Sequence, residues 1–90
     1  MPTYVIEREL PGAGSLSDDE MRAIAEKSNG VLAEMGGAVK WKESFVTPDK
    51  IYCVYLAPDE VSVREHARRA GFPADRVSRL RRVIDPTSAE

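Results

Sequence analysis

Hydrophobic residues follow different spacings along this chain, and each spacing predicts one kind of element. Residues 3–9 are rich in β-forming side chains and predict a first strand. Between residues 21 and 35, apolar and small residues recur at steps of three and four, which predicts one buried face of a helix. That face consists of Met21, Ile24, Ala25, Ser28, Val31, Leu32 and Met35. Residues 51–57 are apolar on both faces, which is typical of a central strand covered on both sides.

Local signals predict where the two helices begin and end. Ser17 and Glu20 have the spacing of a capping box, so the first helix is expected to start there. The paired glycines at 36–37 end it. Asp59 predicts the start of a second helix, which runs to about residue 70 and stops at Gly71. Its inner face is expected to contain Val63, Ala67 and Ala70.

The strand expected at residues 39–46 contains an acid on its apolar side. Strict alternation places Trp41, Glu43 and Phe45 on one face. A carboxylate buried there without a partner would cost several kcal/mol. One interpretation is that Glu43 lies at the sheet edge or pairs with an arginine such as Arg81. The other is that Glu43 lies in a cavity between subunits as a metal ligand or a proton acceptor.

With a last strand expected at residues 77–84, the element order is strand, helix, strand, strand, helix, strand. This order predicts an α+β fold, the ferredoxin-like βαββαβ sandwich, with two helices on one face of a four-stranded antiparallel sheet. The whole chain, residues 1–90, forms one domain with a polar tail from about residue 86. Because the strand at 51–57 is apolar on both faces, we expect a homodimer formed through the sheet face or an edge, with a groove between the subunits.

Charge is unevenly distributed along the chain. Residues 1–60 contain 11 acids and 6 bases, whereas residues 61–90 contain 4 acids and 7 bases, all of them arginine. The overall net charge of −2 argues against a nucleic-acid partner. The arginines are expected to form a solvated face that pairs with acids of the same chain or of a partner.

No apolar stretch approaches the ~20 residues of a membrane helix. The first residues are charged and contain no long apolar run, so we expect no signal peptide, no membrane partner and a cytoplasmic location.

The chain has one cysteine and one histidine, which limits its metal and nucleophile chemistry. Cys53 excludes an intrachain disulfide and is expected to be a core residue, unless His66 or a cation lies beside it. Metal pairs on helices use three- or four-residue spacing, but Ser62 and Arg69 are not ligands of this kind. A metal site at His66 would therefore need residues distant in sequence or from a second subunit. The alternative is a histidine that packs or caps beside the second helix.

Arginines on the last predicted strand raise a further possibility. Alternation places Arg79 and Arg81 on one face and Arg82 on the other. Strand carboxylates such as Glu7 and Glu9 are candidate partners. An acidic small-molecule ligand in the groove is the functional alternative.

Several segments resemble a family of small bacterial proteins of unknown function that are described as nickel-binding-protein-like. They are ERELPGAG, ESFVTPDKIYCVYLAPDE, REHARRAGFPADRV and the ending RRVIDPTSAE. The resemblance implies a ferredoxin-like fold, a dimer and surface binding of nickel for sequestration or handling of excess metal. The ligand-capable residues within these segments are Glu43, Cys53, Glu65 and His66. We therefore expect a small cytoplasmic dimer that binds a divalent transition metal, nickel, with nitrogen from His66 and oxygen from Glu43 or Glu65.

The sequence is also compatible with two other functions. One is a dimeric α+β barrel-type enzyme, or a small-ligand-binding protein, that uses a groove with Glu43 and His66. In it Tyr52 or Tyr55 would orient a substrate, and Arg81 would hold its anionic group. A closed pocket containing Glu43 would favour this alternative. The other is a partner-binding module that docks an acidic protein on its arginine face.

Overall fold

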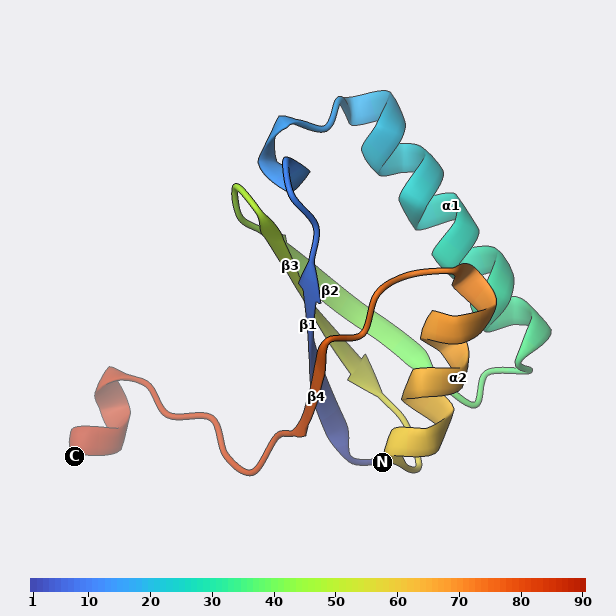
Figure 1. The fold of residues 1–90 in the computed structure, drawn as a ribbon. Helices are drawn as coiled ribbons and strands as arrows, with labels where there is room; N and C mark the ends of the chain where they lie inside the picture. The colour runs from blue at the N-terminus through green and yellow to red at the C-terminus, as the bar shows by residue number, and fades with distance from the viewer.

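Two helices lie on one face of a four-stranded antiparallel sheet in the computed structural model, which describes residues 1–90 (Figure 1). The strands are β1 (Thr3–Glu9), β2 (Lys40–Val46), β3 (Lys50–Leu56) and β4 (Arg76–Arg79). The helices are α1 (Asp18–Glu34) and α2 (Glu60–Ala70), with short 3₁₀ turns η1 (Ala13–Ser15) and η2 (Pro86–Ala89). The sheet order β2-β3-β1-β4 confirms the predicted ferredoxin-like sandwich.

The helix ends follow the predicted local signals. Ser17 Oγ accepts a hydrogen bond from the backbone N–H of Glu20 at 3.1 Å, and Glu20 Oε1 accepts one from the backbone N–H of Ser17 at 3.0 Å. This is the capping box expected at the start of α1. The Asp59 side chain caps α2, and Gly71 ends it with a left-handed φ of 74°.

The two faces of the sheet differ in their surroundings. Alternate residues of the central strands point toward the helices and are buried: Tyr4, Ile6, Arg8, Ile51, Cys53 and Tyr55. Both helices lie on that side, so residues on the other side are half-buried or exposed. This second surface, called the uncovered face below, includes Val5, Glu43, Phe45, Tyr52, Val54 and Leu56. A dimer contact there remains a prediction.

The expectation that Trp41, Glu43 and Phe45 share one face is wrong. A register irregularity lies between Trp41 and Glu43, where β2 holds one extra residue against β3. Trp41 is paired with Tyr55 on the helix side, whereas Glu43 is paired with Val54 on the uncovered face. The bulge reverses the alternation of side chains, so Glu43 leaves the core without any need for a buried partner.

The last strand is shorter than the predicted 77–84. Leu80 still donates its backbone N–H to the Thr3 carbonyl at 2.8 Å. β1 begins at Thr3. The Pro2 carbonyl before it accepts from the Ala57 backbone N–H at 3.1 Å, on the β3 side, so Pro2 offers β4 no further hydrogen bond. The segment 81–90 therefore extends away from the sheet (Figure 1). The prediction that Arg81 lies on a strand is wrong for this reason.

No helix in the chain combines the length and the apolarity that crossing a bilayer requires.

Candidate functional site

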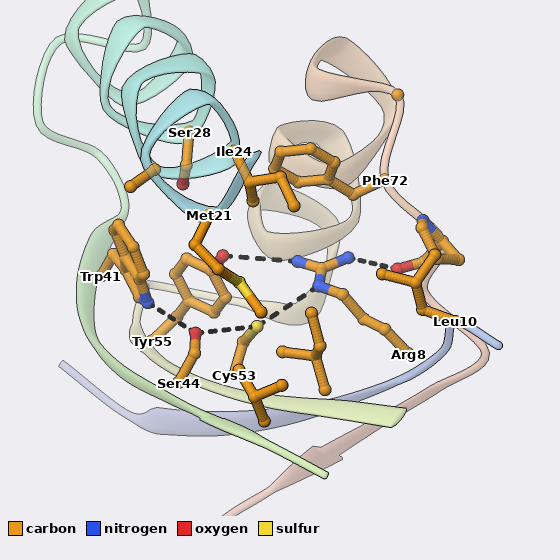
Figure 2. Close-up of a pocket in the computed structure, with 15 residues that line it drawn as sticks. Arg8, Leu10, Met21, Ile24, Ser28, Trp41, Ser44, Cys53, Tyr55 and Phe72 are labelled. Atoms are coloured by element: carbon orange, nitrogen blue, oxygen red, sulfur yellow. Dashed lines mark hydrogen bonds between the residues drawn. The ribbon is translucent and has the colours of Figure 1, made fainter. Parts of the chain in front are cut away.

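A cavity of about 520 Å³ lies between the first half of α1 and the sheet (Figure 2). Met21, Ile24 and Ala25 of α1 line one side, and residues of β1, β2 and β3 line the other. The segment 71–73 after α2 also contributes to the lining. Ten of its fifteen lining residues are hydrophobic, so an apolar molecule would find a matching surface. The predicted apolar face of α1 is therefore only partly buried at these three positions, because it borders this space.

A chain of polar groups crosses the wall that the sheet provides (Figure 2). Trp41 Nε1 donates to Ser44 Oγ at 2.9 Å, and Ser44 Oγ donates to Cys53 Sγ at 3.0 Å. Arg8 Nε also donates to Cys53 Sγ, at 3.4 Å. Cys53 is buried, as expected of a core residue, but it contacts a cation rather than His66.

Arg8 is the least expected member of this site. It is only 4% exposed, donates from Nη2 to Tyr55 Oη at 3.3 Å and from Nη1 to the Pro73 carbonyl, and lies 5.5 Å from the centre of the Phe72 ring. It forms no ion pair with any carboxylate of the chain. In the sequence, Arg8 lies between two acids, Glu7 and Glu9, and such a run of charges indicates an exposed segment. Alternation with Ile6 was the signal that could have placed it inside.

His66 lies in the core between the two helices and the sheet. It is fully buried, and its Nε2 is 3.2 Å from Ser28 Oγ and 3.4 Å from Tyr55 Oη. Its Nδ1 has no hydrogen-bond partner. Burial, and secondarily the charge of Arg8, lowers the pKa of His66 to about 4. The imidazole is therefore neutral at neutral pH.

The other predicted ligands lie in separate places. Glu43 is exposed on the uncovered face. Glu65 lies on α2, where hydrogen bonds from Arg68 and Arg69 lower its pKa to about 2. Cys53 and His66 are on the helix side of the sheet. No group of three or more His, Cys, Asp or Glu side chains in the chain is arranged to hold a metal ion.

The residues of the alternative ligand groove are also dispersed. Tyr55 lines the cavity, Tyr52 lies on the uncovered face, and Arg81 is exposed beyond β4. Glu43 does not line the cavity. A groove that uses both Glu43 and His66 is not formed within the chain, because the sheet separates them.

Comparison with known proteins identifies the family. The sequence model of a family described as "Nickel responsive protein SCO4226-like" matches residues 4–80. The chain belongs to the SCO4226-like family. This confirms the resemblance found in the sequence. Residues 4–80 contain all the predicted metal ligands and the whole lining of the cavity, from Arg8 to Pro73, and omit the extended segment 81–90.

A solved structure supports the fold of this SCO4226-like chain. It is similar to the crystal structure of SCO4226 from Streptomyces coelicolor A3(2), with a TM-score of 0.76 and 19% sequence identity. The match covers 91% of this chain and 99% of that chain, so the two folds agree over nearly their full lengths. No curated protein matches the sequence.

Proposed function

We propose that this protein binds nickel as cargo at open surface sites, for sequestration or handling of the metal. Membership of a family named for nickel responsiveness supports a role involving this metal. The structural observation that supports such a site is that the Glu43 carboxylate is accessible and has no partner. Among the four predicted ligands, only Glu43 is exposed and free of hydrogen bonds and ion pairs.

A single carboxylate cannot complete the coordination of nickel, which takes several nitrogen or oxygen ligands. Glu43 lies on the uncovered face, which includes Tyr52, Val54 and the 54% exposed Phe45. In a two-fold homodimer formed through this face, the same patch of each copy meets, so two Glu43 side chains can approach one ion. Water completes the shell. We expect weak binding that is linked to dimerisation.

In this proposal His66 stays a core residue. Reaching a surface ion would require its Nε2 to leave Ser28 and Tyr55 and α2 to move away from the sheet. Glu65 is likewise held by two arginines and would have to give up both charge-assisted hydrogen bonds.

Calorimetric titration of tag-free protein with nickel chloride tests the proposal. The wild type should bind saturably, and Glu43→Gln should weaken binding at least tenfold, because the amide lacks the negative charge. Glu26→Gln is the matched control, since Glu26 is an exposed and unpaired glutamate on α1. It should bind like the wild type. Absence of binding by the wild type, or unchanged binding by Glu43→Gln, would refute the proposal.

Sedimentation velocity at a series of protein concentrations tests the linked dimer. Nickel should shift the monomer–dimer midpoint to lower concentration in the wild type and leave it unchanged in Glu43→Gln. If nickel does not change the monomer–dimer midpoint of the wild type, metal binding is not linked to dimerisation.

A further inference from the structure

The cavity beside α1 contains a buried positive charge that the chain itself does not neutralise. The Arg8 guanidinium has five N–H donors, and three of them donate hydrogen bonds. All three acceptors are uncharged: a thiol, a phenol and a backbone carbonyl. Buried arginines are normally paired with a carboxylate or phosphate, because an unpaired buried charge is costly. The missing partner is an anion.

The surroundings of Arg8 limit what that anion can be. The guanidinium points into the middle of the cavity lining, toward Tyr55 and Cys53 (Figure 2). Apart from Ser28 and Ser44, the remaining wall is largely apolar and includes Met21, Ile24 and Trp41. An occupant must therefore combine one anionic group with an apolar body.

We infer that this cavity binds a small monocarboxylic acid whose body is aliphatic or aromatic. The carboxylate accepts hydrogen bonds from the free N–H groups of Arg8, and its two oxygens match the planar guanidinium. A single charge balances a single arginine, and no second cation lines the cavity to favour a phosphate dianion. The volume of about 520 Å³ lies within the range of small-ligand sites.

This inference is independent of nickel. The cavity is on the helix side of the sheet, whereas Glu43 is on the uncovered face. The two proposals can therefore succeed or fail separately, and Glu43→Gln should leave carboxylate binding unchanged.

The test uses octanoate and 3-phenylpropanoate as probes, with 1-octanol and 3-phenylpropanol as neutral controls of similar shape. Trp41 is the only tryptophan of the chain and lines the cavity, so its fluorescence reports occupancy, and calorimetry gives the affinity. At least one acid should bind saturably and at least tenfold more tightly than its alcohol. If neither acid binds, or if acid and alcohol bind equally, the inference is wrong.

Two variants separate the roles of charge and space. Arg8→Met keeps an apolar side chain of similar length and should lower acid affinity at least tenfold while leaving alcohol binding unchanged. Arg22→Met, at an exposed arginine of α1, is the matched control and should change neither. Ala25→Phe places a ring in the cavity wall and should abolish binding of acid and alcohol alike.

Circular dichroism establishes that each variant is folded. If Arg8→Met does not fold, Ala25→Phe and the comparison of acid with alcohol still decide the question. Acid binding that is undiminished in folded Arg8→Met, or that survives in folded Ala25→Phe, would overturn the inference.

Discussion

At the scale of single residues, burial decides which polar groups can meet a ligand. The sequence placed His66 beside the inner face of a helix but could not show that Ser28 and Tyr55, 38 and 11 residues away, meet its Nε2. Arg8 was missed because its neighbours in the chain are exposed or half-buried charges. The partners of both side chains come from distant segments and could not be predicted from local patterns, although alternation with Ile6 could have placed Arg8 inside.

The buried state of His66 predicts a specific pH dependence of stability. The imidazole takes up a proton near pH 6.5 in the unfolded chain but only near pH 4 in the folded chain. Between these values the unfolded state binds more protons, so stability is lost as the pH falls through this window. The loss attributable to His66 should reach roughly 3 kcal/mol at about pH 4.

Urea unfolding of the wild type and His66→Gln across this pH range measures the effect. Glutamine does not titrate, so the free energy of unfolding of the variant should depend less steeply on pH than that of the wild type. Parallel pH dependences of the two proteins would mean that His66 is not held in its neutral form.

At the scale of elements, local sequence signals predicted the helices and most of the strands. The details that differ from the prediction depend on how neighbouring strands pair. The helix ends at Ser17 and Gly71 follow from capping residues, whose effect is local. The β2 bulge and the early end of β4 depend on what the neighbouring strand offers, and alternation along one strand cannot show this. The bulge is what moved Glu43 to the uncovered face.

A close contact between η1 and the turn joining β2 to β3 leads to a prediction at this scale. The Gly14 backbone N–H donates to the Pro48 carbonyl at 3.0 Å, and a Cβ at Gly14 would lie 2.9 Å from the Pro48 Cα. Gly14→Ala should therefore destabilise the protein by about 1–3 kcal/mol, because the backbone of one loop must shift. The glycine at position 30 of α1 has open space around it, so Gly30→Ala should stabilise the protein by roughly 0.5–1 kcal/mol.

Chemical denaturation of both alanine variants against the wild type checks this pair. Opposite signs are expected from the same substitution. A Gly14→Ala protein as stable as the wild type would show that the two loops do not need to approach so closely.

At the scale of the whole molecule, the chain is built with one well-covered sheet face and one uncovered face. Only 15 of the 90 residues are buried, which is a small core for this length. The sequence predicted this imbalance from the two-sided apolar strand that became β3, whose Tyr52, Val54 and Leu56 are half-buried. The homodimer expected from that strand stays a prediction, because the fold of one chain does not show what covers this face. The proposed nickel site depends on this imbalance, since it places Glu43 where two copies would meet.

Nuclear magnetic resonance spectra recorded during titration with nickel locate the metal, because the paramagnetic ion broadens signals from nearby nuclei. If nickel binds at Glu43, the amide signals of Glu43, Phe45 and Val54 should broaden first, and those of Ser28 and His66 should remain sharp. Early loss of the His66 and Ser28 signals with an intact Glu43 signal would place nickel in the helix layer and contradict the proposed surface site.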